Sequence, residues 1–338
     1  PGVRAVLTHE DVPGLNRYAY SYVEDQPLLA QDVAQYQGDA LVAVAAVDVA
    51  TARAAMEAVE VDLEPIDGIF DPQAAMEPGA PRVWPDRDNV HEHLVIEQGD
   101  IGSGFASAEV VIEGEYTTQM IEQAFLEPEG AVAFVAPDGT MVVYASCQAP
   151  HRDRKQIARA LGVSENQVRV ITPYIGGAFG GKDEAHVQIH AALLARASGC
   201  PVRILRTREE SIRTHVKRHP VRIRYKTGAT RAGRITAVHV EAIGDTGPYV
   251  NAGAEVMSVL AATAFGPYQV PNARIEAFTV LTHNPICGAM RGFGIPQGTF
   301  ACERQMDRLA RELEIDPLEL RLRNGLETGA LLPTGAVL

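Results

Sequence analysis

The sequence predicts an α+β fold, in which strands and helices are mixed without strict alternation. Apolar residues alternate on both sides of Pro137-Asp138-Gly139, which indicates an antiparallel hairpin. Helical patterns lie among such strands, and the chain has no tandem repeat. With 338 residues, of which 46% are apolar, the chain is long enough for about two domains and a large core.

A small α/β domain is expected over residues 1–67. Residues 40–47, ALVAVAAV, predict a buried strand, and the alanine-rich segment that follows predicts a helix capped by Asp48. Residues 60–66, EVDLEPI, alternate like a half-buried strand. Residues 68–104 are rich in Pro, Gly, Asp and Asn, so we expect a linker there.

A larger mixed α+β domain is expected over residues 105–338. Its predicted helices have recognisable ends, because proline favours a first helical turn and glycine follows a last one. The predicted strands are 109–118, the hairpin around 137–139, 167–171, the hairpin 220–245 and 274–281. The predicted helices are 150–161, 183–198 and 296–324, the last one broken at Asp316-Pro317.

Charge and cysteine usage exclude several classes of protein. The formal net charge of -13 disfavours nucleic acid as a partner. The cysteines, Cys147, Cys200, Cys287 and Cys302, form no C-x-x-C pair, which disfavours zinc-ribbon or iron–sulfur ligation within this chain. Reduced thiols fit a cytoplasmic protein. No apolar run is long enough to span a bilayer, so we expect no membrane partner.

A glycine-rich loop, GGAFGGKD over residues 176–183, lies between a predicted strand and a predicted helix. Its spacing matches the phosphate-binding pattern G-x-x-x-x-G-K, but Asp183 stands where that pattern needs Ser or Thr for magnesium. A P-loop-like nucleotide binder is therefore a remote alternative. The backbone N–H groups of such a loop can still approach a ligand closely, and a tight turn without a ligand is the other interpretation.

Two histidine pairs have the i, i+4 spacing that suits zinc on a helix. They are His186 with His190 and His215 with His219. The metalloprotease pattern needs Glu after the first histidine, and Val187 and Val216 stand there instead. We therefore expect core or capping histidines and no direct metal ligand.

A turn of small residues, GAMRGFG, carries Arg291 and Phe293 just before a predicted helix. An arginine held in such a turn can present its planar fork to an anionic or carbonyl-rich ligand. An ordinary surface turn is the alternative interpretation.

Taken together, five segments resemble the molybdenum-binding subunit of the xanthine dehydrogenase and aldehyde oxidase family. In chain order they are QMIEQAFLEPEG, ASCQAP, GGAFGGKD, GDTGPYVNAG and GAMRGFGIPQGTF. The resemblance covers essentially the whole chain. It implies that residues 1–67 are a hammerhead-like domain, incomplete at its N-terminus, and that residues 105–338 are the first of two molybdopterin-binding domains.

The resemblance also implies roles for individual residues. Gln148 stands where the family glutamine approaches an oxygen on molybdenum, and Arg291 where the family arginine lies beside the cofactor. Gly177, Ala178, Phe179 and Gly180 form the loop whose backbone meets the metal centre. Asp183 and Phe293 stand at substrate-facing positions.

The activity that the resemblance implies is hydroxylation with water as the oxygen source. The substrate is a purine-like N-heterocycle or an aldehyde, and a molybdenum–molybdopterin, plain or in its cytosine dinucleotide form, is the cofactor. Electrons leave through iron–sulfur and FAD centres in other subunits or domains.

The sequence departs from the family pattern in three ways. The second cofactor domain, which carries the base glutamate, is absent after Leu338, so no catalytic residue is expected in this chain. The chain is then, alternatively, a non-catalytic half of a split subunit or a truncated fragment that needs a second chain. No arginine occurs in 254–268, which disfavours xanthine itself, and Gly292 replaces the cysteine of carbon monoxide-oxidising members.

Overall fold

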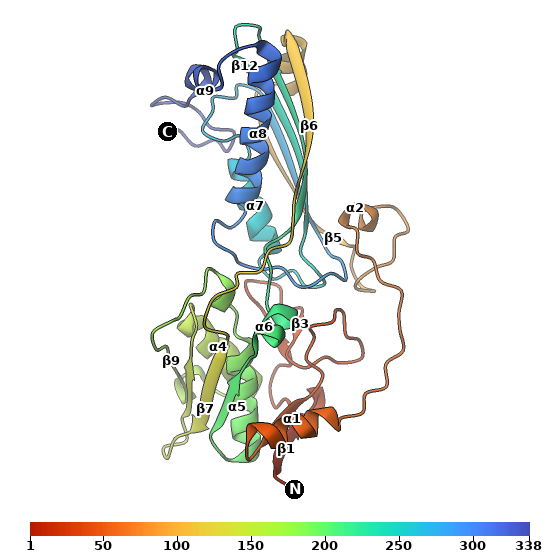
Figure 1. Cartoon of the computed structure of the whole chain (residues 1–338), viewed down its shortest axis with the longest axis vertical. Coiled ribbons are helices and arrows are strands. Elements are labelled where there is room, and N and C mark those ends of the chain that lie inside the picture. Colours follow the sequence, from red (N-terminus) through yellow and green to blue (C-terminus); the bar gives the residue numbers. More distant parts are fainter.

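The computed structural model describes residues 1–338 and has two lobes, each built around its own sheet (Figure 1). The lower lobe comprises residues 1–67 and 119–214, and the upper lobe comprises residues 68–118 and 215–338. Each lobe has a large cluster of buried apolar side chains. This mixed arrangement of helices and sheets confirms the predicted α+β class.

The sheet of the lower lobe has four strands in the order β10-β7-β8-β9. Strands β7 and β8 form the predicted antiparallel hairpin, and β8 pairs with β9 in parallel after a crossover through helix α4. The elements are β7 (Gly130–Val135), β8 (Met141–Ala145), α4 (Pro150–Leu161), the 3₁₀ turn η2 (Glu165–Gln167), β9 (Val168–Ile171), α5 (His186–Ser198), β10 (Val202–Leu205) and α6 (Arg208–Thr214).

The N-terminal residues share the core of this lobe. Strand β1 (Val3–Leu7) pairs antiparallel with β4 (Ala43–Ala46), and helix α1 (Val49–Glu57) begins at the predicted cap, where Asp48 Oδ1 accepts from Thr51 N at 2.7 Å. Leu7, Leu29 and Ala45 pack in one cluster with side chains of α4 and α5. The short elements here are η1 (His9–Asp11), β2 (Arg17–Tyr18) and β3 (Gln26–Pro27).

The strand predicted over residues 60–66 does not form. These residues are irregular, and Val61 and Leu63 are exposed rather than half-buried. The alternation of apolar residues was present, but no neighbouring strand pairs with the segment. A strand needs both a pattern and a hydrogen-bonding partner.

The upper lobe contains a five-stranded sheet in the order β5-β13-β12-β11-β6. The predicted hairpin is β11 with β12, and β12 pairs with β13 in parallel after the helical crossover α7. Helices α7 and α8 pack against one face of the sheet (Figure 1). The elements are β6 (Val110–Thr118), β11 (Val221–Ala229), β12 (Ile235–Asp245), α7 (Gly253–Thr263), β13 (Ala273–Val280), α8 (Ile295–Leu313) and α9 (Pro317–Asn324). The predicted break at Asp316-Pro317 is confirmed, because Asp316 caps α9.

The linker predicted over 68–104 needs a correction. It contains α2 (Pro72–Ala75), α3 (Ile101–Ala106, which ends just beyond it) and the nine-residue edge strand β5 (Val90–Gln98). β5 pairs antiparallel with β13, and its Leu94 and Ile96 pack on the upper core. The segment before β5 is rich in Pro and Asp, so the alternating apolar residues of β5 were assigned to the linker. No helix of the chain combines the length and the apolar character that crossing a membrane requires.

His219 of the upper lobe is 1% exposed and has Nε2 3.4 Å from the Thr246 hydroxyl oxygen. Burial lowers the pKa of this imidazole to about 3, because the charged form loses its hydration and Arg218 lies nearby. The native state therefore holds His219 neutral, while the unfolded chain protonates it near its ordinary pKa of about 6.5. The contribution of neutral His219 to the stability of the native state is complete above pH ~6.5. This contribution is lost as the pH falls toward about 3, because the unfolded state then binds the proton that the native state excludes.

We predict that the His219→Gln variant is less sensitive to acid than the wild type. Between pH ~6 and 4 the wild type should lose up to about 1.4 kcal/mol of unfolding free energy per pH unit more than the variant. Urea denaturation at several pH values measures this slope. Equal slopes for the two proteins would show that His219 does not take up the proton on unfolding.

Candidate functional site

The glycine-rich loop lies at the junction of the two lobes. It follows β9 and precedes α5 of the lower lobe, and Arg291 N donates to Phe179 O at 2.9 Å from the upper lobe. Residue Phe179 has a positive φ of 54°, so the loop turns sharply at its centre. The arrangement brings the loop and the turn that contains Arg291 side by side.

Two glycines let neighbouring segments approach the loop. A Cβ atom at Gly180 would lie 2.7 Å from Ala289 O, and one at Gly181 would lie 2.3 Å from His215 Nε2. Gly180 also has a φ of 98°, which a side chain would strain. These glycines therefore serve close packing between segments, a role that the phosphate-binding interpretation did not include.

A clamp formed by Glu127 and Lys182 closes the loop. Glu127 Oε2 accepts hydrogen bonds from Gly176 N at 2.6 Å, Lys182 Nζ at 2.8 Å and Ser146 Oγ at 2.8 Å. The Lys182 side chain is fully buried, and its ammonium lies over the Phe125 ring. Burial raises the pKa of Glu127, but Lys182 and Gly176 outweigh it and hold that pKa below its usual value.

The inward direction of Lys182 removes the basis of the nucleotide-binding alternative. In a phosphate-binding loop the lysine reaches the ligand, whereas here its ammonium is occupied by Glu127 and Ser146. The loop has the glycine spacing of a phosphate-binding loop, but its lysine does not point toward a ligand.

Gln148 and Arg291 present free donors beside the loop. Gln148 Oε1 accepts from Gly180 N at 3.0 Å, which fixes the amide orientation and leaves the Nε2 hydrogens unused. The Gln148 N–H donates to Lys182 O at 2.8 Å. The Arg291 side chain is exposed and makes no hydrogen bond or ion pair in the chain. Two donors that can bind oxygen atoms of an anionic ligand therefore lie beside the loop, Gln148 on the segment after β8 and Arg291 on the turn before α8.

Asp183 does not open a helix as predicted. It ends a 3₁₀ turn, η3 (Gly181–Asp183), and the extended residue Glu184 separates it from α5. Both carboxylate oxygens have partners: the Tyr20 hydroxyl donates to Oδ2 at 2.9 Å, and Arg152 pairs with Oδ1. The carboxylate thus links the N-terminal residues to the loop, and the substrate role remains a prediction.

A cavity of about 480 Å³ lies near the predicted substrate residues. Its wall includes Val23 of the N-terminal residues, His91 of β5, Asn251, and Glu255 and Val259 of α7. Two contacts connect the site to this wall. Asn251 Nδ2 donates at 2.9 Å to Glu184, the residue after Asp183. Gly294, the residue after Phe293, packs on the α7 backbone.

Only one of the two histidine pairs lies on a helix: His186 and His190 are both on α5. Helix α6 ends at Thr214, so His215 and His219 lie on an extended segment instead of one helix face. His190 on α5 lies with Nε2 2.7 Å from Leu28 O, where it joins the N-terminal residues to the helix. His186 faces Glu184 at 3.4 Å.

Sequence reasoning missed the residues that hold the site. These residues are Glu127 in FLEPEG, Ser146 in ASCQAP and Lys182 in GGAFGGKD. The sequence patterns gave none of them a role. The available signal was a charged lysine in an otherwise small, apolar loop, which needs an acidic partner if it is buried. Nothing in the sequence spacing identifies Glu127 as that partner.

Comparisons with known proteins identify the family of the chain. Residues 83–325 match the family model for the molybdopterin cofactor-binding domain. Residues 1–67 match the model for the a/b hammerhead domain of aldehyde oxidase and xanthine dehydrogenase.

Two curated relatives are similar along nearly the whole chain. A probable xanthine dehydrogenase subunit of Bacillus subtilis is 42% identical over 96% of this chain, which spans 43% of that protein. The nicotinate dehydrogenase large molybdopterin subunit of Eubacterium barkeri is 40% identical over 100% of this chain, which spans 79% of that protein.

Among solved structures, aldehyde oxidoreductase from Desulfovibrio gigas superposes with a TM-score of 0.95 and 32% identity. The match covers 100% of this chain and 38% of that one. The chain therefore belongs to the molybdopterin cofactor-binding domain family of aldehyde oxidases and xanthine dehydrogenases.

Proposed function

We propose that this chain is the cofactor-holding part of a molybdenum hydroxylase. The observation that carries the proposal is the convergence of Gln148, Phe179 and Arg291, with the Gln148 amide and the Arg291 guanidinium left as free donors. The substrate is an N-heterocycle or an aldehyde. Nicotinate, xanthine and aldehydes appear in the names of its relatives, and these compounds define the substrates to be tried.

The residues present fit a molybdenum–molybdopterin cofactor. Gln148 Nε2 can donate to an oxygen on the metal, and the Arg291 fork can bind phosphate or carbonyl oxygens of the pterin part. The backbone of Gly177, Ala178, Phe179 and Gly180 lies where such a group can approach. When bound, the cofactor supplies the oxidising centre that takes hydride from the substrate carbon. The cytosine dinucleotide form is the finer proposal.

The cavity lined by Val23, Asn251 and α7 is the candidate substrate site, and the neighbours of Asp183 and Phe293, Glu184 and Gly294, contact its wall. Phe293 can offer an aromatic face to a planar ring. Asp183 would accept hydrogen bonds from ring N–H groups through oxygen lone pairs that Tyr20 and Arg152 leave open, since a carboxylate has about four acceptor sites.

The partners that we propose are a second molybdopterin-binding domain or chain, which supplies the base glutamate, and iron–sulfur and FAD subunits. Exposed apolar side chains near the loop support such a docking face. They include Leu126, which is 92% exposed, Tyr174, Ile175 and Phe179. A non-catalytic half that acts only after assembly is the second candidate, and the same surface favours it. We place the protein in the cytoplasm, which the absence of disulfides among its cysteines supports.

We predict that Arg291→Lys lowers both the molybdenum content and the turnover of the assembled enzyme. An ammonium cannot reproduce the planar fork, so kcat/KM should fall roughly tenfold to a hundredfold, the equivalent of one or two charge-assisted hydrogen bonds. Metal analysis and assays with nicotinate, xanthine and an aldehyde measure this. Arg224→Lys, on the exposed face of β11, is the matched control. An assembled wild-type enzyme without molybdenum would refute the proposed function itself.

We further predict that Asp183→Ala changes substrate handling and leaves the molybdenum content unchanged. Loss of a charge-assisted hydrogen bond to the substrate should lower kcat/KM, with a loss of about 1.5–3 kcal/mol of transition-state stabilisation. Tyr20→Phe removes one structural contact of the same carboxylate and is the control, which should keep the wild-type substrate ranking. If Asp183→Ala instead loses the metal and keeps the ranking, this residue holds the cofactor or the fold.

A further inference from the structure

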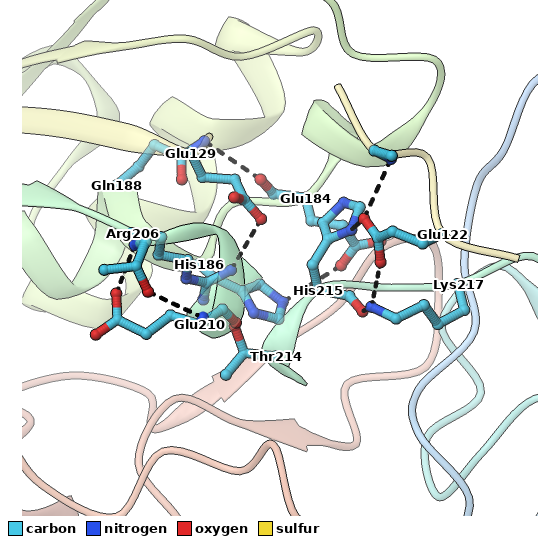
Figure 2. Close-up of polar contacts among 12 residues, drawn as sticks. Glu122, Glu129, Glu184, His186, Gln188, Arg206, Glu210, Thr214, His215 and Lys217 are labelled. Carbon is cyan, nitrogen blue, oxygen red and sulfur yellow. Dashed lines mark hydrogen bonds and ion pairs between the residues drawn. The ribbon is translucent and has the colours of Figure 1, made fainter. Parts of the chain in front are cut away.

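A small cavity of about 10 Å³ lies behind the glycine-rich loop, inside the protein. Figure 2 shows the polar side chains gathered around it, contributed by segments that are far apart in the sequence. Apart from the clamp residues Ser146 and Lys182, its polar lining comprises Glu129, Glu184, His186, Gln188, Arg206 and His215. None of these residues has a role toward the proposed cofactor or substrate.

Three buried oxygen atoms in this lining have no partner in the protein. Gln188 Nε2 donates to Asp153 Oδ2 at 3.0 Å and to Glu184 O at 3.2 Å, which leaves Gln188 Oε1 unpaired. Glu129 Oε1 binds Arg206 at 3.1 Å, and its Oε2 is unpaired. Glu184 Oε2 accepts from Asn251 at 2.9 Å, and its Oε1 is unpaired.

These oxygen atoms are deeply buried. Glu129 is 6% exposed, Glu184 is 7% exposed and Gln188 is 2% exposed. Buried polar atoms without a partner are rare, because each one loses its hydration without compensation. Three of them around one cavity therefore point to a shared partner inside it.

His215 closes the same cavity from the side of the loop. The residue is 3% exposed, and its ring packs edge-on against Phe125 with centroids 5.0 Å apart. Neither ring nitrogen has a hydrogen-bond partner: Nδ1 faces Glu122 at 3.4 Å, and Nε2 abuts Gly181. A nitrogen that can donate or accept a hydrogen bond thus joins the three acceptors.

We propose that this cavity is a built site for one ordered water molecule, held by Glu129, Glu184, Gln188 and His215. Its volume matches the roughly 10–15 Å³ that a single water needs, and a buried water makes about two to four hydrogen bonds. The water donates to acceptor oxygens of the lining and shares a hydrogen bond with His215 Nε2.

The charges around the cavity favour water over an ion. The Arg206 guanidinium and the Lys182 ammonium line it and disfavour a cation, while the Glu129 and Glu184 carboxylates disfavour an anion. Burial raises the pKa of Glu129, but Arg206, His215 and nearby hydrogen-bond donors together outweigh burial and keep that pKa below its usual value, so the carboxylate is ionised. The pair Arg206–Glu129 is already neutral and needs no further charge.

The bound water fixes the rear of the cofactor loop. It connects His215, whose ring packs against Gly181, to the Glu129 and Glu184 carboxylates. Residues 176–183 are thereby supported from behind at Gly181, in addition to the clamp at Glu127. This role is separate from the proposed function and does not need a bound cofactor.

A crystal structure of the protein, from crystals grown with and without rubidium chloride, tests the proposal. We expect one density peak in the cavity in both, within hydrogen-bond distance of at least two of the three acceptors and without anomalous signal from rubidium. An anomalous peak in the cavity would show that a monovalent cation binds there instead of water, and would overturn the proposal. Side chains rotated to pair directly, with the cavity closed, would overturn it as well.

The variant Gln188→Met tests the lining, because it removes one acceptor and keeps a similar volume. We expect the peak to be lost in this variant and retained in the control Leu194→Met, a buried change on the same helix away from the cavity. A peak that is unchanged in Gln188→Met refutes the site as described. The wild-type structure decides the proposal even if this variant does not fold.

Discussion

The ion pair between Glu127 and Lys182 is the interaction on which the rest of the site depends. One oxygen of Glu127 binds both ends of the glycine-rich loop, through Gly176 N and Lys182 Nζ, and also the end of β8 through Ser146. Because the lysine side chain is buried, removal of its partner would leave an uncompensated charge at a cost of about 3–5 kcal/mol. The pair turns the lysine inward, so the loop presents its backbone, Phe179 and Gln148 to the outside.

The second constraint is that the loop belongs to both lobes. The two ends of the loop continue into β9 and α5 of the lower lobe. The turn before α8 of the upper lobe donates a hydrogen bond to Phe179 O and packs closely against Gly180. The N-terminal residues contribute a further contact through Tyr20 and Asp183. A ligand that binds Gln148 and Arg291 together would therefore hold the two lobes in one relative position.

Most of the fold was predictable from local patterns, and the exceptions have physical causes. Pro150, Asp48 and Asp316 marked helix starts correctly, because capping is a local interaction. The strand predicted over 60–66 does not form, and strand β5 was not predicted. Whether a segment becomes a strand depends on pairing with a distant strand, which β5 has and residues 60–66 lack. The roles of Gln148 and Phe179 came from a family resemblance, whereas the turn of small residues had already indicated Arg291. The clamp could not be predicted, because Glu127 and Lys182 are 55 residues apart and meet only in the folded chain.

We propose that the buried pair Glu127–Lys182 shapes the loop for a molybdenum cofactor. The most direct test is the molybdenum content of the assembled enzyme in Lys182→Met, Glu127→Gln and the double variant, determined together. Each single variant should lose most of the metal, and the double variant should retain more than the two separate losses imply, because no unpaired buried charge remains. Wild-type molybdenum content in both single variants would contradict the account.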